Sequence, residues 1–144
     1  MQVLGVLRSK GSTVATTGSD ATVASVVAAL ADHGVGALVV SDDGRHVDGI
    51  VSERDVVRAL AVHGPAVLGR EVSEIMTAQV VTCDLATPIH VLAGLMTSHR
   101  VRHIPVLDGG VLAGIVSIGD VVKSRIAELE AETEAIRDYV QNGW

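Results

Sequence analysis

The chain has no phenylalanine, and aromatic residues make up only 1% of its 144 residues. Hydrophobic residues nevertheless make up 48% of the sequence. A chain of this length can form one domain with a proper core, and that core must be built from aliphatic side chains. A bound nucleobase would therefore lie between aliphatic side chains and not on an aromatic platform.

Cysteine and positive charge are also scarce. Cys83 is the single cysteine, which excludes a disulfide framework within the chain and predicts a small core residue in a reducing compartment. The formal net charge of −6 argues against a nucleic-acid partner, because proteins that bind phosphate backbones carry a basic face. No apolar run is long enough to span a bilayer, and the basic residues follow the apolar N-terminal run where a signal peptide would have them first. We expect a cytoplasmic protein with neither membrane nor nucleic acid as partner.

Catalytic and metal-binding patterns are missing as well. The six histidines never form a His-x-x-x-His pair on one helix, and no Gly-x-Ser-x-Gly elbow, Walker loop or Cys-His pairing occurs. The sequence offers no nucleophile with a base beside it. We therefore expect neither a metal site nor an enzyme.

A duplicated stretch is the strongest pattern that the chain does contain. Residues 49–55 and 114–120 both read Gly-Ile-Val-Ser-x-x-Asp. Two branched apolar residues suit a buried strand, and a helical pattern begins after the serine. The stretch predicts a strand that runs directly into the start of a helix.

This junction has two interpretations that rest on the same atoms. In one, Ser52 or Ser117 caps the helix, while Asp55 or Asp120 reaches back and completes a capping box. In the other, the free amides and the positive dipole end of the helix bind a phosphate. Ser-x-x-Asp alone favours capping, whereas duplication of the whole stretch favours a functional role.

The other elements repeat in the same order as the duplicated stretch. The first unit predicts a short helix, a strand, an amphipathic helix, two strands and a helix, over residues 3–10, 14–17, 23–33, 36–40, 47–51 and 53–62. The second unit restarts with a short helix at 72–77 and a strand at 80–83. The predicted organisation is a first repeat, a connector, a second repeat and a C-terminal helical extension, at residues 1–64, 65–70, 71–124 and 125–144.

These repeats resemble a tandem pair of cystathionine β-synthase (CBS) domains. The resemblance rests on the two Gly-Ile-Val-Ser-x-x-Asp stretches, on Glu74-Ile75-Met76-Thr77 between the repeats, and on Val101-Arg102-His103-Ile104-Pro105-Val106 in the second. It implies a mixed α/β module of two pseudo-twofold repeats with a long C-terminal helix. It also implies two clefts that bind an adenosine-containing ligand such as AMP, ATP, ADP or NAD, with no obligatory cofactor.

The resemblance further implies roles for residues of this chain. The two motif aspartates match residues that hold ribose hydroxyls, the two serines face ribose or phosphate, and Arg102 and His103 match a basic pair that contacts phosphate. The predicted nucleotide-binding residues are Thr16, Gly36, Ala37, Ser52, Arg54, Asp55, Thr82, Arg102, His103, Ile104, Pro105, Ser117, Gly119 and Asp120.

The two repeats differ at the basic pair, which predicts unequal clefts. The first repeat has Gly36 and Ala37 where the second has Arg102 and His103, so phosphates are expected beside the second repeat. Gly119 either leaves room for a ligand or packs against the other repeat.

Three functional hypotheses remain open on the sequence alone. The first is a non-catalytic nucleotide sensor that passes its signal to a separate effector protein. The second is a structural or interaction protein whose Ser-x-x-Asp motifs are only caps. The third is a small hydrolase with Asp55 or Asp120 as base, which is weaker because a lone carboxylate has no partner to tune its pKa.

The last helical segment carries an apolar stripe at alternating spacings of four and three. Its residues are Val122, Ile126, Leu129, Thr133, Ile136 and Val140. This spacing is typical of a seam that packs helix against helix, so we expect a homodimer in which this helix takes part. The alternative is that the stripe folds back on its own domain.

Overall fold

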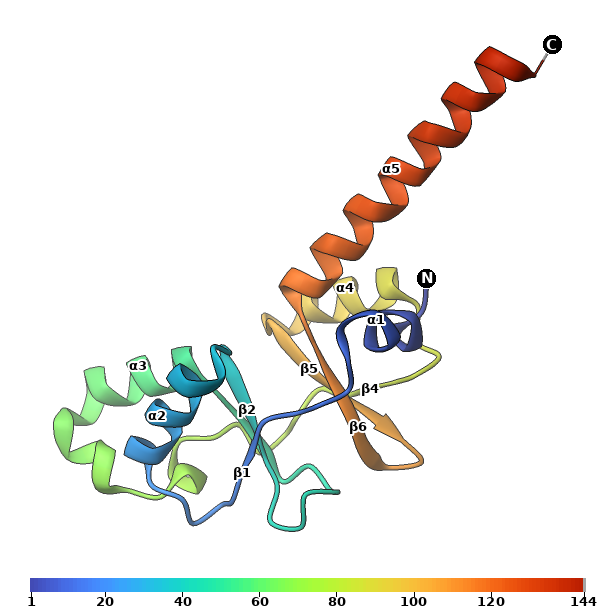
Figure 1. The fold of residues 1–144 in the computed structure, drawn as a ribbon. Helices are drawn as coiled ribbons and strands as arrows, with labels where there is room; N and C mark the ends of the chain where they lie inside the picture. The colour runs from blue at the N-terminus through green and yellow to red at the C-terminus, as the bar shows by residue number, and fades with distance from the viewer. Residues whose placement is uncertain (144) are drawn as a thin grey trace.

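The computed structural model describes residues 1–143, which form two lobes, each with one three-stranded sheet (Figure 1). In the first sheet the order is β1-β2-β3, with strands at Thr16–Thr17, Ala37–Val40 and Gly49–Ser52. β1 and β2 are parallel, and β2 and β3 are antiparallel. All four residues of β2 are buried, as expected for the central strand of a covered sheet.

Capping residues set the ends of two helices in the first lobe. In α2 (Val23–His33), Thr22 caps the N-terminus by accepting a hydrogen bond from the amide of Ser25, and Gly34 ends the helix in the left-handed region. Helix α3 (Glu53–His63) starts directly after Ser52, the last residue of β3 and the N-cap of the helix. Both helices follow the predicted order of elements.

The second lobe repeats the arrangement. Its sheet has the order β4-β5-β6, with strands at Cys83–Asp84, His103–Asp108 and Val111–Ser117. Again the first pair is parallel and the second antiparallel. The helices are α4 (Ile89–His99) and α5 (Ile118–Asn142).

The strand predicted at residues 80–83 is shorter and begins later, at Cys83. The two lobes show why. In the first sheet the amide of Val39 donates to the carbonyl oxygen of Ala15 at 3.2 Å. The matching residue in β5 is Pro105, which has no amide hydrogen, so the parallel ladder cannot extend in the same way. Likewise, the strand predicted at 14–17 is limited to Thr16–Thr17.

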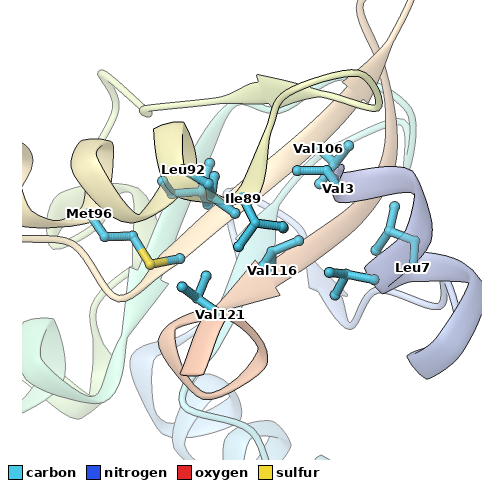
Figure 2. Close-up of a cluster of buried hydrophobic side chains, with 10 residues drawn as sticks. Val3, Leu7, Ile89, Leu92, Met96, Val106, Val116 and Val121 are labelled. Carbon is cyan, nitrogen blue, oxygen red and sulfur yellow. The ribbon is translucent and has the colours of Figure 1, made fainter. Parts of the chain in front are cut away.

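The short helices are exchanged between the lobes. Helix α1 (Val3–Lys10) packs against the second sheet, where Val3 and Leu7 join the same apolar cluster as Leu92 and Val116 (Figure 2). Conversely, Val72 of the 3-10 helix η2 (Val72–Glu74) belongs to the core of the first sheet. The chain thus crosses between the lobes twice, and the two repeats depend on each other for their cores.

The connector between the lobes is also partly helical. Residues Pro65–Gly69 form the 3-10 helix η1, with the proline at its start, where its missing amide hydrogen costs nothing. Val67 in this helix is fully buried.

Helix α5 leaves the body of the protein after its first turns and projects away from it (Figure 1). Val121 and Ser124 are buried, whereas the residues of the apolar stripe are exposed, from 46% for Leu129 to 64% for Ile136. The alternative in which the stripe folds back on its own domain is therefore wrong. Among residues 1–143, no helix is both long and apolar enough to cross a membrane.

Candidate functional site

Both duplicated junctions form complete capping boxes. The Ser52 hydroxyl accepts a hydrogen bond from the amide of Asp55 at 3.3 Å, and Asp55 Oδ2 accepts one from the amide of Ser52 at 2.8 Å. Ser117 and Asp120 repeat these distances. The capping interpretation is confirmed for both motifs, and each cap uses a single carboxylate oxygen of its aspartate.

The remaining surroundings of the two aspartates differ. Among the described residues, Asp55 has hydrogen bonds only to Ser52, so its Oδ1 has no partner. Asp120 Oδ2 also forms an ion pair with Lys10 Nζ, at the end of α1, with 2.6 Å between the two atoms. Burial raises the pKa of Asp120, but the hydrogen bonds from Lys10 and Ser117 outweigh it and hold this pKa below its usual value. Within residues 1–143, Oδ1 accepts no hydrogen bond in either aspartate, and the two differ in that Asp120 has an ion pair with Lys10 while Asp55 has hydrogen bonds only within its cap.

A cavity of about 350 Å³ lies beside Asp55, between the two repeats. We call it the inter-repeat cleft. The first repeat contributes Gly36, which precedes β2, and residues of β3 and α3, and the second contributes the extended segment before β4 and the residues from the end of α4 to the start of β5. The residues that line it are Gly36, Ile50, Ser52, Glu53, Arg54, Asp55, Arg58, Thr77, Gln79, Val80, Val81, His99, Arg100, Val101, Arg102 and His103.

The cleft is basic although the whole chain is acidic. Four arginines line it, against the two carboxylates of Glu53 and Asp55. Arginine forks suit phosphate oxygens by their bidentate geometry. Its apolar patches are aliphatic and include Ile50, Val80 and Val81. The cleft thus offers both cationic side chains for an anion and aliphatic side chains for a flat apolar group.

Two of these arginines were not predicted. Arg58 lies one helical turn beyond Arg54, so the two share a face of α3, and this spacing could have revealed it. Arg100 has a φ of 54°, and it is the only residue other than glycine with positive φ among those described. The matching position in the first repeat is Gly34, at φ 62°. Both residues end their helices in the left-handed region, which is more costly for arginine than for glycine.

His103 begins β5 and lies close to Gly36 of the other repeat. A side chain at Gly36 would bring its Cβ within 3.1 Å of His103 Cε1, so the missing side chain makes room for the imidazole. Burial lowers the pKa of His103, and the charges of Lys10 and Arg102 act in the same direction, against Glu53 and Asp120.

The cleft gathers one part of the predicted site. Gly36, Ser52, Arg54, Asp55, Arg102 and His103 line it. The others do not: Ala37, Ile104 and Pro105 are buried in the sheets, Thr16 begins β1, Thr82 directly precedes β4, and Ser117, Gly119 and Asp120 lie at the second motif.

The glycines of the two motifs have a packing role. An added Cβ at Gly49 would approach Met76 Sδ to 2.5 Å and the carbonyl oxygen of Thr77 to 3.0 Å, and one at Gly114 would approach Leu7 to 2.7 Å. Each glycine thus leaves room for a segment of the other repeat, the residues that follow η2 at Gly49 and α1 at Gly114. At Gly119 an added Cβ would meet only Ser117 Oγ, at 3.6 Å. The packing explanation for Gly119 is therefore wrong, and its surroundings have room.

Within residues 1–143, no group of three or more His, Cys, Asp or Glu side chains is placed to hold a metal ion. The fold and the cleft together define a duplicated α/β module with a basic site between its repeats. Residues 12–62 and 72–127 both match the family model for the CBS domain, and the chain belongs to the CBS domain family.

Known relatives share this organisation. CBS domain-containing protein CBSX3, mitochondrial, of Arabidopsis thaliana is 37% identical over 130 residues, which are 88% of this chain and 63% of that relative. This chain therefore spans less than two thirds of that relative's length. The crystal structure of the CBS-domain containing protein ATU1752 from Agrobacterium tumefaciens has a TM-score of 0.84 and 44% identity, and the match covers 87% of this chain and 99% of that one.

A further solved structure contains a ligand. It is the CBS domain protein PAE2072 from Pyrobaculum aerophilum, complexed with AMP. Its TM-score to this chain is 0.79, with 29% identity over 92% of this chain and 99% of that one.

Proposed function

We propose that the protein is a non-catalytic regulatory module that binds an adenine nucleotide, AMP first among them, in the inter-repeat cleft. The observation that carries this proposal is the free Oδ1 of Asp55 in a cleft that also holds four arginines. A carboxylate suits a ribose diol because it accepts from two hydroxyl donors, and arginine suits phosphate. The AMP complex of the Pyrobaculum relative supports the same ligand class.

The parts of the ligand have distinct expected positions in the cleft. The ribose hydroxyls would donate to Asp55, and the phosphate would lie near Arg102 and His103. The base would lie among the aliphatic side chains of Val80, Val81 and Ile50. ADP, ATP and NAD share the adenosine part, and their additional phosphates would extend toward the other arginines.

The signal would pass to another molecule, because a sensor of nucleotide state needs a response. We propose a cytoplasmic homodimer whose shape changes when nucleotide binds and is read by a separate effector protein. Linkage requires that the ligand bind the two shapes with different affinity. The single Cys83, without a second cysteine to pair with, suits a reducing compartment.

Isothermal titration calorimetry with AMP, ADP, ATP and NAD tests the proposal. Arg102→Ala should weaken AMP binding by tenfold or more, since a hydrogen bond to a charged group contributes about 1.5–3 kcal/mol. Its exposed side chain contributes little to folding, so the melting temperature of the free variant should hardly change. Arg8→Ala, an exposed arginine of α1 outside the cleft, is the matched control.

Three results would reject the proposal. If none of the four nucleotides binds, the Ser-x-x-Asp motifs are only helix caps and the protein is structural. If Arg102→Ala binds AMP as the wild type does, the phosphate does not lie at Arg102 and AMP does not bind the inter-repeat cleft as proposed. If chromatography after incubation shows that the nucleotide has been converted, the module is an enzyme and the hydrolase hypothesis replaces the sensor.

A further inference from the structure

We propose that the projecting part of α5 pairs with α5 of a second copy as a parallel, two-stranded coiled coil. This inference takes the homodimer of the proposed function as its starting point and adds the surface and the orientation. It does not depend on nucleotide binding. Three features of the helix carry it: which face is free, which residues form the seam, and which charges flank the seam.

The apolar stripe lies on the face of α5 that points away from its own module. Written as a heptad repeat abcdefg, the residues at a are Ile126, Thr133 and Val140, and those at d are Val122, Leu129 and Ile136. The contacts with the body come from the opposite side of the helix, at positions c and f. There Val121 and Ser124 are buried, Ser124 Oγ lies 3.0 Å from Met1 Sδ, and Glu128 pairs with the N-terminal amino group of the chain at 3.4 Å. The module holds the back of the helix and leaves the stripe free.

The seam residues suit two parallel strands. Every residue at a is β-branched, and Leu129 in the central heptad stands at d, the combination that favours parallel dimers, whereas the other two d residues, Val122 and Ile136, are β-branched and do not favour dimers. Thr133 places one polar side chain in the middle of the seam. A buried polar residue at this position lowers the stability of the coiled coil but fixes the register of its two helices. Its hydroxyl already donates to the carbonyl oxygen of Leu129 at 2.9 Å, so this group would not be left unsatisfied.

The flanking charges select the parallel orientation. Positions e hold Lys123, Glu130 and Arg137, and positions g hold Arg125, Glu132 and Tyr139. In a parallel pair each g residue faces the e residue five positions further along the partner. Arg125 then faces Glu130 of the other copy, and Glu132 faces Arg137, and symmetry repeats both attractive pairs. Arg125 bonds Glu128 of its own helix through Nη1, which leaves further donors of its guanidinium free.

The antiparallel orientation places like charges together. In the register of greatest overlap, e faces e and g faces g. Glu130 would then face Glu130 of the other copy, Glu132 would face Glu132, and Lys123 would face Arg137. Since all these pairs repel, the charges disfavour this orientation while they support the parallel one.

Cysteine cross-linking measures the orientation directly, in the full chain with Cys83→Ala as background. In a parallel pair the two copies of residue 136 face each other at d. In the antiparallel register they are about 15 Å apart along the helix, since each residue rises 1.5 Å. Ile136→Cys should therefore form a disulfide-linked dimer on mild oxidation, and Glu130→Cys, whose copies meet only in the antiparallel pair, should not. A linked Glu130→Cys dimer, or the absence of linkage at Ile136→Cys, would overturn the proposal.

Charge reversal gives an independent test through sedimentation velocity. Glu130→Lys with Glu132→Lys turns all the attractive parallel pairs into repulsive ones and should raise the dimer dissociation constant by about tenfold or more. Adding Arg125→Glu with Arg137→Glu exchanges the signs and should restore dimerisation. In an antiparallel pair the first double change leaves repulsion as it was, so an unchanged dissociation constant would contradict the proposal. A wild-type chain that stays monomeric would also contradict it.

The same variants separate this inference from the proposed function. Their substitutions lie outside the inter-repeat cleft, so AMP binding should persist in each of them. A variant that loses the dimer but still binds AMP tests α5 alone and leaves the proposed function unaffected. A wild-type chain that does not bind AMP rejects the proposed function and leaves the pairing of α5 unaffected.

Discussion

His103 is the residue through which the cleft should respond to pH. Its pKa lies below the ordinary value because burial, Lys10 and Arg102 disfavour the imidazolium, so the ring is neutral at neutral pH. A bound phosphate would favour the charged ring. AMP affinity should therefore rise as pH falls from about 8 to about 6, by more than in His103→Gln. Calorimetry of both proteins across this range measures the difference.

His103→Gln is the necessary reference because the AMP phosphate itself titrates near pH 6. Identical pH profiles for the two proteins would show that His103 does not contact the phosphate. Folding stability of the free protein should change with pH in the opposite direction to AMP affinity. Because the folded-state pKa is depressed, the unfolded chain takes up the proton more readily, and stability falls as pH drops below about 6.5.

Cys83 should be an inert thiol in the folded protein. It is half-buried, its Sγ lies 3.9 Å from the carbonyl oxygen of Pro105, and burial, with a smaller contribution from Asp84, raises its pKa to about 11. The thiolate is the reactive form, so at pH about 8 very little of it is present. Labelling with a thiol reagent should be slow in the native protein and fast in denaturant. Equally fast labelling in both states would contradict the packing described for β4.

Three glycines should differ in how substitution by alanine changes the stability of the protein. Gly49→Ala would press a methyl group against Met76 and the Thr77 carbonyl, and Gly114→Ala against Leu7, so each should lower stability by about 1–3 kcal/mol. Gly119→Ala has room and sits in the first turn of α5, where alanine should stabilise by about 0.5–1 kcal/mol. Chemical denaturation of the three variants gives these values.

The change in stability should thus have one sign at Gly49 and Gly114 and the opposite sign at Gly119. If Gly49→Ala and Gly114→Ala are as stable as the wild type, then α1 and the η2 segment do not pack on the sheets as described. A destabilised Gly119→Ala would show that its surroundings are tighter than the 3.6 Å approach to Ser117 Oγ indicates.

The elements themselves were largely predictable, because local patterns specify them. The alternation of apolar residues and the Ser-x-x-Asp signals located α2, α3, the start of α5 and the strands that run into the motif helices. The length of β4 could not be read in this way, because it depends on Pro105 of a distant strand. Nor could the destination of α1, because an apolar face such as that of Val3 and Leu7 can cover either sheet. Only the assembled structure shows the exchange.

Only part of the candidate site was predictable from the sequence, namely residues in the repeated motifs and in the basic pair. The motif residues Ser52 and Asp55 and the basic pair Arg102 and His103 all line the cleft, although the sequence did not show that one cleft would join the two repeats. Their counterparts Ser117 and Asp120 do not line this cleft. The ion pair with Lys10 joins residues far apart in sequence, and no local pattern announces it.

The molecule as a whole is a duplication whose two halves have become unequal. Both halves keep the same strand order and the same capping box. One motif aspartate opens into a basic cleft and the other is paired with Lys10. The duplication thus supplies an internal control, since the same substitution can be made at a cap that faces the cleft and at a cap that does not.

AMP titration of Asp55→Asn and Asp120→Asn, with thermal melting of both, tests the central claim most directly. Both substitutions weaken a capping box and should lower stability by about 0.5–2 kcal/mol. Asp55→Asn alone should also weaken AMP binding at the inter-repeat cleft, by tenfold or more, while Asp120→Asn should retain that binding event. Loss of stability in both variants with unchanged AMP affinity in Asp55→Asn would contradict the account.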